Sequence, residues 1–155
     1  MQEVIDALRG YQSQVLVRLQ GLAEDDLRRK EAEGKWAIAD VLAHLADFEL
    51  VIAVRLRSML ASEHPALQPM EQAQWVARVH RGEPIDELLE QFRFLRELNV
   101  RLLERVRDDE WARTGEHPQA GSISLSAITE RLARHDARHL AQIDRIRTTH
   151  GLTNA

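Results

Sequence analysis

Apolar residues recur every three or four positions along four segments of this chain, and this spacing constrains the fold more than any other feature. In the second segment, residues 38–59, the apolar stripe advances by steps of 3, 4, 3, 4, 4 and 3. Comparable stripes cover residues 4–22, 85–106 and 125–146. Because this spacing places apolar side chains on one face of an α-helix, each segment is predicted to be an amphipathic helix.

Four such helices favour an all-α fold, a four-helix bundle in which the apolar stripes face one another. Stretches that alternate apolar and polar residues, as half-buried strands do, are almost absent. The chain has 155 residues, which suits a single domain over residues 1–155.

Two of the predicted connections are long. Residues 63–83 and 108–123 exceed the 2–8 residues that usually join helices in a simple bundle. We expect a short helix over residues 70–80 within the first connection and loop structure in the second, followed by Ser124 as the N-cap of the fourth helix. Long crossover loops allow helices that are not neighbours in sequence to pack side by side.

Composition excludes several classes of function. The chain has 21 basic and 25 acidic residues, so its net charge of −4 gives no reason to expect a nucleic acid or an anionic membrane as partner. The absence of cysteine excludes disulfides, iron–sulfur clusters and thiolate chemistry. Residues 1–9 lack a secretory pattern, and the longest apolar run, residues 50–54, is far shorter than the roughly 20 residues that span a bilayer. We therefore expect a cytoplasmic protein.

Two histidines interrupt the apolar stripe of the fourth segment. His135 and His139 occupy stripe positions between Leu132 and Ile143, so both rings are predicted to face the bundle interior, one turn apart. Two imidazoles at this spacing can bind one metal ion. A pair of hydrogen-bonded core histidines is the alternative. Asp136 follows the first histidine where a zinc-protease signature has glutamate, so that motif is not assigned.

A third histidine lies at the edge of the second segment's stripe. His44 precedes Phe48 by one turn, and it can join the pair if the second and fourth helices are neighbours. Three neutral imidazoles without a fourth protein ligand form an open site with room for water or substrate. A boundary histidine without a ligand role is the alternative for His44.

Several motifs resemble those of the DinB/YfiT-like family. Trp36 followed by His44-Leu45-Ala46-Asp47-Phe48-Glu49 is similar to that family's second-helix signature. The closing segment is similar too, with His117-Pro118, Gly121, Ser124-Leu125 and then His135-Asp136-x-x-His139-x-x-Gln142. The likeness extends over nearly the whole chain, and the spacing of the three histidines is its most specific part.

The resemblance implies a four-helix bundle with helix order 1-2-4-3, in which the second helix lies beside the fourth. It also implies a divalent transition metal, most often nickel or zinc, held by His44, His135 and His139. Family members are often homodimers. Some transfer a low-molecular-weight thiol to electrophiles, and others are described as metal-dependent hydrolases.

Other polar residues near the three histidines are weaker candidates. Asp47 could orient a ligand imidazole or act as a base on metal-bound water, or it could be a solvated or capping residue. Asp136 could support His135, and Asp47 and Asp136 are the two weak candidates for a catalytic role. Arg55 lies on the same flank as His44 and could neutralise an anionic substrate, or it could lie along the bundle margin. His117 is expected to be structural, and His64, His80 and His150 are expected to have no special role.

Three hypotheses follow. The first is a metal-dependent enzyme, a hydrolase or thiol S-transferase with an open three-histidine site and an unidentified small-molecule substrate. The second is a non-catalytic metal-binding or structural bundle linked to stress. The third is a bundle whose histidines are hydrogen-bonded core residues and bind no metal. An open coordination position at the floor of a pocket would favour the first hypothesis.

Overall fold

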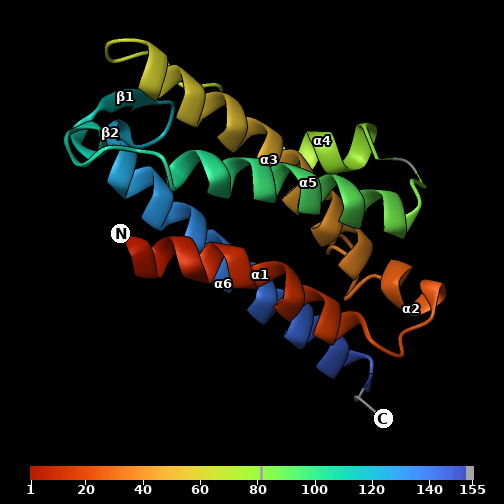
Figure 1. The fold of residues 1–155 in the computed structure, drawn as a ribbon. Helices are drawn as coiled ribbons and strands as arrows, with labels where there is room; N and C mark the ends of the chain where they lie inside the picture. The colour runs from red at the N-terminus through yellow and green to blue at the C-terminus, as the bar shows by residue number, and fades with distance from the viewer. Residues whose placement is uncertain (81, 153–155) are drawn as a thin grey trace.

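Each of the four amphipathic segments forms a long helix in the computed structural model, which describes residues 1–80 and 82–152. The helices are α1 (Gln2–Leu19), α3 (Ile38–Ala61), α5 (Ile85–Leu103) and α6 (Leu125–Thr149). They form the bundle shown in Figure 1. No helix in the described ranges is both long and apolar enough to cross a membrane.

Within the described residues, the connections contain five short elements. These are α2 (Glu24–Arg28), α4 (Gln72–Arg78), the 3-10 helix η1 (Asp108–Ala112), β1 (Thr114–His117) and β2 (Gly121–Ser124). Helix α4 confirms the short helix expected in the first long connection. The second was expected to be a loop, but β1 and β2 pair there as an antiparallel hairpin. The fold is therefore mostly helical rather than entirely so.

The order of the helices around the bundle differs in part from the order that the resemblance implied. Among the described residues, α3 packs against α5 and α6, and α1 packs against α6 and α5. The second and fourth long helices are therefore neighbours, as expected. The full order 1-2-4-3 is wrong, because the order observed is α1-α6-α3-α5. Residues 20–37 and 104–124 are connections long enough to cross the bundle diagonally, so consecutive helices need not be adjacent.

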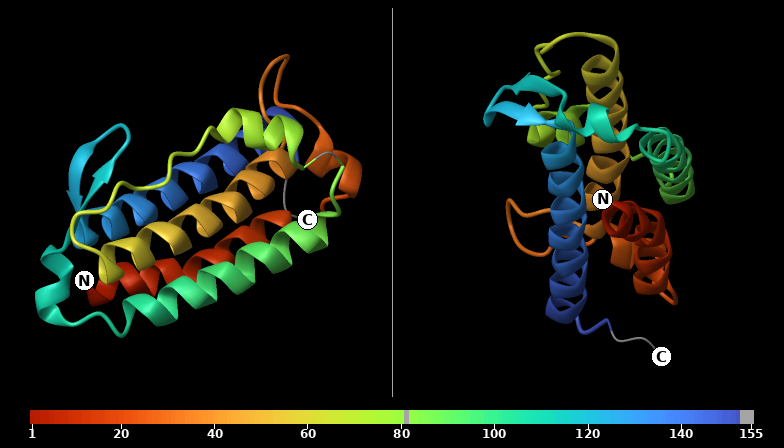
Figure 2. Two further views of the ribbon diagram at one scale, coloured as in Figure 1. Left: turned by 90° about the horizontal axis from the view of Figure 1, so that it is seen from above. Right: turned by 60° about the vertical axis from the view of Figure 1, so that its left-hand side comes forward.

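Helix directions explain the longest connection. Figure 1 shows α1 and α6 running one way and α3 and α5 running the other way. Because α3 and α5 are parallel neighbours, the chain between them must return along the bundle, and Figure 2 shows it doing so with α4 on its course. Backbone hydrogen bonds join this crossover to β1: Leu67 N–H donates to Glu116 O at 2.9 Å, and Glu116 N–H donates to Pro65 O at 2.8 Å.

A helix N-cap was expected at Ser124 and is confirmed. Its Oγ accepts from the Ala127 N–H at 3.1 Å. The start of α3 has no capping side chain at Ala37. Instead, the Asp40 carboxylate, three residues further on, accepts from the Ala37 N–H at 2.9 Å. Both contacts satisfy backbone donors that a helix start leaves without partners.

Two apolar clusters fill the bundle, one at each end. One contains Tyr11, Val41, Phe92 and Ile143 among others, and the second contains Leu8, Leu56, Leu103 and Leu132. Between the two clusters, α3, α5 and α6 contribute a layer of buried polar side chains that includes Glu49, Arg96 and Asp136.

Arg96 of α5 is the centre of this polar layer. Its Nη1 donates to Asp136 of α6 at 2.7 Å and to the Leu8 carbonyl of α1 at 2.9 Å, and its Nη2 donates to Glu49 of α3 at 2.7 Å. Asn99 also donates to the Glu49 carboxylate, at 3.0 Å. One buried cation therefore joins all four long helices at the level where the three histidines lie.

Candidate metal centre

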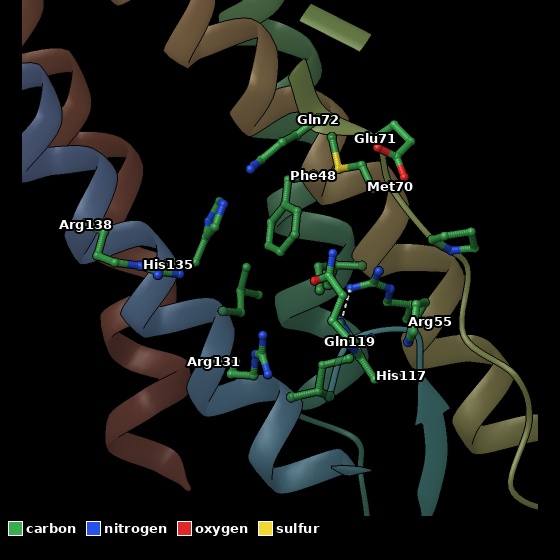
Figure 3. Close-up of a pocket in the computed structure, with 15 residues that line it drawn as sticks. Phe48, Arg55, Met70, Glu71, Gln72, His117, Gln119, Arg131, His135 and Arg138 are labelled. Atoms are coloured by element: carbon green, nitrogen blue, oxygen red, sulfur yellow. Dashed lines mark hydrogen bonds between the residues drawn. The ribbon is translucent and has the colours of Figure 1, made fainter. Parts of the chain in front are cut away.

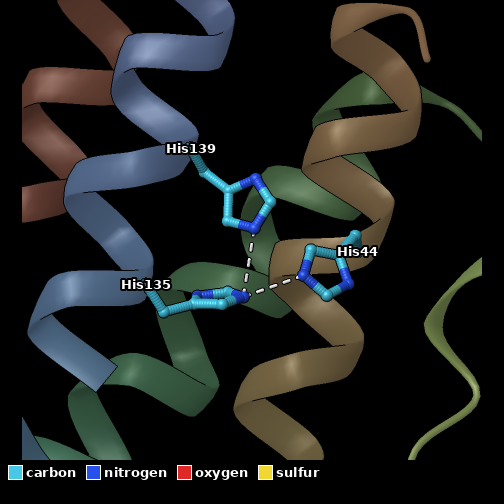
Figure 4. Close-up of side chains that lie close together, drawn as sticks. All are labelled: His44, His135 and His139. Carbon is cyan, nitrogen blue, oxygen red and sulfur yellow. Dashed lines mark hydrogen bonds between the residues drawn. The ribbon is translucent and has the colours of Figure 1, made fainter. Parts of the chain in front are cut away.

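The three predicted ligands come together in the polar layer. His44 of α3 and His135 and His139 of α6 point toward one another across the space between these helices (Figure 4). Nε2 of His135 lies 2.8 Å from Nε2 of His44 and 3.1 Å from Nε2 of His139. The candidate ligand atoms of the three rings all lie within 4.8 Å of one another. The expected convergence is confirmed.

The donor chemistry of the three rings fits a cation. Nε2 of His135 faces two other ring nitrogens, but it can offer only one hydrogen or one lone pair, so protons alone satisfy the cluster poorly. Imidazole nitrogens bound to one tetrahedral zinc ion at about 2.0–2.1 Å lie roughly 3.3 Å apart. Small outward shifts of the rings would give that spacing.

Burial keeps all three rings in the neutral form that binds metal. His44 is 1% exposed and His135 is 7% exposed. Burial, with smaller contributions from the other two histidines, lowers the pKa of His44 to about 3. Burial also lowers the pKa values of His135 and His139. At neutral pH the rings therefore present lone pairs rather than charges.

Neighbouring side chains hold the rings in place. Phe48 stacks on His135 with the ring centroids 3.9 Å apart, and Trp36 lies 5.3 Å from His44. Nδ1 of His139 lies 2.9 Å from the Gln142 side-chain oxygen. A proton on that Nδ1 satisfies the oxygen and leaves the Nε2 lone pair directed at the other two rings. Nδ1 of His44 and Nδ1 of His135 are buried without a hydrogen-bond partner in the described part of the chain.

Asp136 lies beside the candidate centre, but its carboxylate is paired with Arg96. Its two oxygens accept from the guanidinium at 2.7 and 3.1 Å, whereas Nδ1 of His135 is 3.7 Å away, too far for a hydrogen bond. Burial raises the pKa of Asp136, and the charge of Arg96 partly offsets the rise. The catalytic role considered for Asp136 stays a prediction.

Asp47 is buried rather than solvated, because it pairs with His80 of the crossover. Nε2 of His80 donates to Asp47 at 2.7 Å, and Nδ1 of His80 contacts Glu83. Burial lowers the pKa of His80, but the hydrogen bonds to Glu83 and Asp47 and their charges outweigh it, so the net shift is upward. The expectation that His80 has no special role is wrong. No periodicity marks a residue in a connection, so the sequence carried no signal for this pair.

A cavity of about 500 Å³ reaches the candidate centre at His135, which lies on its wall. Figure 3 shows the cavity between α3 and α6, covered by the crossover and by the loop after β1. Arg55, considered in the sequence, lines it together with Arg131 and Arg138, which sequence reasoning missed. Both lie on α6 within four residues of His135, and that spacing was the available signal.

Comparison with known proteins places the chain in a family. A sequence model described as the DinB superfamily matches residues 7–143. This chain belongs to the DinB superfamily. Membership confirms the resemblance drawn from the histidine motifs.

Relatives of this DinB superfamily member carry one description. A protein of Oceanobacillus iheyensis is 25% identical over 141 residues, covering 91% of this chain and 82% of its own length. A protein of Geobacillus kaustophilus is 29% identical over 154 residues, and the match covers 97% of this chain and 86% of that protein. Both are named "Putative metal-dependent hydrolase".

Two solved structures share the fold. YfiT from Bacillus subtilis, described as "a probable metal-dependent hydrolase with an unusual four-helix bundle topology", has a TM-score of 0.91 at 21% identity, over 98% of this chain and 88% of that one. The mycothiol-dependent maleylpyruvate isomerase has a TM-score of 0.75 at 15% identity, and the match covers 92% of this chain and 60% of that one. At these identities the likeness shows the fold, and the DinB superfamily chain is a four-helix bundle of that type.

Proposed function

We propose that this DinB superfamily protein is a metal-dependent hydrolase in which His44, His135 and His139 hold one divalent transition metal ion, nickel or zinc. One observation carries the proposal: three neutral imidazoles, two of them buried and that of His139 half-buried, converge at Nε2 of His135, on the wall of a cavity. The names of the relatives in Oceanobacillus and Geobacillus support the reaction class.

Neighbouring residues hold the ligand rings in place and leave one coordination position open for a reaction. An ion held there supplies Lewis-acid chemistry, which polarises a substrate and lowers the pKa of bound water. Phe48 restrains the His135 ring by stacking, and Gln142 restrains the His139 ring through Nδ1. Three protein ligands, with a cavity on the side of His135, leave space for water and substrate.

Neither Asp47 nor Asp136 is proposed as the general base. Asp136 accepts two hydrogen bonds from Arg96, and Asp47 accepts one from His80. Each carboxylate therefore joins helix α3 or α6 to a neighbouring element. We assign both of them a positioning role, which keeps the ligand helices in register.

Elemental analysis of protein purified without a histidine tag tests the metal. We expect about one transition metal per chain, loss of that metal in His139→Leu, and full retention in His64→Leu, which makes the same change at an exposed histidine. If the protein contains no metal even after incubation with nickel and zinc, the three histidines are better explained as hydrogen-bonded core residues.

Turnover of model esters and amides by the metal-loaded protein tests the reaction. Hydrolysis without added thiol, lost in His139→Leu, is the expected result. Turnover that requires both a low-molecular-weight thiol and an electrophile would instead support the S-transferase. Stoichiometric metal with no turnover would support the non-catalytic alternative.

A further inference from the structure

A second polar group lies in the cavity, on the side opposite His135. Arg55 of α3 and His117 at the end of β1 lie side by side there and are 5% and 6% exposed (Figure 3). Nε and Nη2 of Arg55 donate to the Gln68 carbonyl of the crossover at 3.0 and 2.6 Å. These two hydrogen bonds fix the guanidinium and leave other N–H groups of Arg55 available.

The contact between His117 and Arg55 lacks an acceptor. The backbone N–H groups of Gln119 and Ala120 lie 3.2 and 3.3 Å from Nδ1 of His117, so Nδ1 is the nitrogen with the lone pair. The hydrogen of the neutral ring is therefore on Nε2. Nε2 in turn lies 3.2 Å from Nη1 of Arg55, which always carries hydrogen. Two buried donors thus face each other, and an acceptor placed beside them would satisfy both.

The charge around these donors is positive. Arg131 and Arg138 also line the cavity, and within the described residues no carboxylate forms an ion pair with Arg55, Arg131 or Arg138. Glu71, the carboxylate on the lining, is exposed. Burial, Arg55 and Arg131 all lower the pKa of His117, which keeps the ring neutral with its Nε2–H in place.

The cationic side chains extend away from the candidate metal centre. Arg131 precedes His135 by four residues on α6, about 6 Å along the helix. On α3, Arg55 lies eleven residues beyond His44, about 16 Å along that helix. A molecule filling the cavity would therefore have one end at the histidines and the other end at Arg55 and His117.

We propose that Arg55, His117 and Arg131 form an anion-binding subsite for a carboxylate or phosphate group on the substrate. Either group offers oxygen acceptors for the Nε2–H of His117 and for the remaining N–H groups of Arg55, and Arg131 adds its charge at the exposed side. The proposal depends on the proposed function only in making this anion part of the substrate. The subsite itself requires no metal.

Titration of the metal-free protein with inorganic phosphate, and separately with acetate, tests the subsite. The side-chain nitrogen signals of His117, followed by NMR, report on the Nε2–H directly. We expect saturable binding of at least one anion, with the Nε2–H signal shifting as that hydrogen acquires an acceptor. The anion that binds identifies the group as phosphate or carboxylate.

Variants separate a built subsite from general attraction to positive charge. Arg131→Gln should weaken binding about ten-fold, because it removes a charged donor. Arg134→Gln is the matched control, since Arg134 is exposed on the same helix and is not part of the cavity lining. Arg55→Lys keeps the charge but loses the planar guanidinium, so it should weaken anion binding more than Arg131→Gln does. A cooperative melting curve for Arg55→Lys would show that the variant is folded.

Two results would overturn the subsite: no response of His117 to either anion, or equal weakening by Arg131→Gln and Arg134→Gln. Metal content measured on the same samples separates this proposal from the hydrolase. Anion binding by a protein that takes up no metal would retain the subsite and overturn the metal centre. Metal uptake without anion binding would retain the metal centre and overturn the subsite.

Discussion

At the scale of single residues, Arg96 occupies the most demanding position in the bundle. It is 3% exposed and is surrounded by Glu49, Asp136 and the aromatic rings of Tyr11 and Phe92. Burial disfavours its charge, but the two carboxylates outweigh this and raise the pKa of Arg96. The charge is therefore permanent, and its removal would leave two buried carboxylates with one cation fewer.

Arg96→Leu should lower the free energy of unfolding by about 3–5 kcal/mol, because Glu49 and Asp136 would lose their buried partner. Urea denaturation followed by circular dichroism measures the change. Arg93→Leu, at an exposed position of the same helix, should alter stability by less than about 0.5 kcal/mol. Equal stability of the two variants would contradict the role given to the polar layer.

The histidines predict a pH dependence for the metal-free protein. Burial lowers the pKa of His44 from 6.5 to about 3, so between these pH values the unfolded chain binds a proton that the native chain does not. Stability should be fully present above about pH 6.5 and fall toward pH 3, by up to about 1.4 kcal/mol per pH unit for each such histidine.

Urea unfolding at several pH values between these limits measures that slope. His44→Phe should have a shallower slope than the wild type, because one native histidine with a depressed pKa has been removed. His64→Phe changes an exposed histidine and should leave the slope unaltered. Parallel slopes for all three proteins would show that His44 titrates normally in the folded chain.

Sequence reasoning found the site residues that repeat with the helix and missed those that depend on distant contacts. His135 and His139 could be predicted because they occupy positions that the stripe reserves for apolar residues. His44 could be predicted from its place at the edge of the second stripe, and the family resemblance supported it. The pairing of Asp47 with His80, and the capture of Asp136 by Arg96, join residues 33 and 40 positions apart. No local pattern encodes such pairs, since each depends on how the helices are arranged.

At the scale of elements, the crossover between α3 and α5 depends on a few contacts. Helix α4 has only seven residues, too few to be stable alone in water. Val76 is the buried residue of α4, and His80, just beyond the helix, joins Asp47 of α3. The crossover covers the cavity, so these contacts also determine access to the candidate site.

His80→Ala should therefore loosen the crossover without unfolding the bundle. We expect faster amide hydrogen exchange over residues 65–80, with α1 and α6 unchanged, because loss of the His80 ring leaves Asp47 without its partner. Hydrogen exchange read by mass spectrometry locates the effect. Gln74→Ala, at an exposed position of α4, should exchange like the wild type. Acceleration throughout the chain would mean that His80 supports the whole fold.

The long helices were predictable because each has its own stripe, whereas the hairpin and the helix order were not. The strands have four residues each and include Gly115, where an added Cβ would come within 2.9 Å of the Leu67 side chain. This close approach to the crossover becomes apparent only after folding. The helix order depends on whether each connection crosses or returns along the bundle, and loop length alone permits either.

At the scale of the whole molecule, we expect a homodimer, on the basis of the family resemblance. Light scattering at micromolar concentration should give twice the chain mass of 17.8 kDa. The measurement is best made with and without bound nickel or zinc, so that any effect of the metal on assembly is seen. A mass of one chain under both conditions would contradict the prediction.

The position of the candidate centre makes global stability a test of metal binding. Along α6, His135 and His139 lie between the two apolar clusters, and together with His44 they join α6 to α3. An ion that binds the folded chain and not the unfolded one raises stability by mass action, by about 2.7 kcal/mol when its free concentration is 100 times the Kd. Chelation at neutral pH should therefore lower the melting temperature, and nickel or zinc should restore it.

His139→Leu makes the metal site and the hydrogen-bonded core behave differently. In a metal site the variant should lose the response to chelator and to added metal, because two imidazoles bind far more weakly than three. In a plain core, an apolar side chain in place of a buried polar ring should be tolerated or stabilising. His64→Leu should respond to chelator as the wild type does. If chelator and metal leave the wild-type melting curve unmoved, and His139→Leu is at least as stable, then these three histidines are core residues and the hydrolase proposal loses its metal.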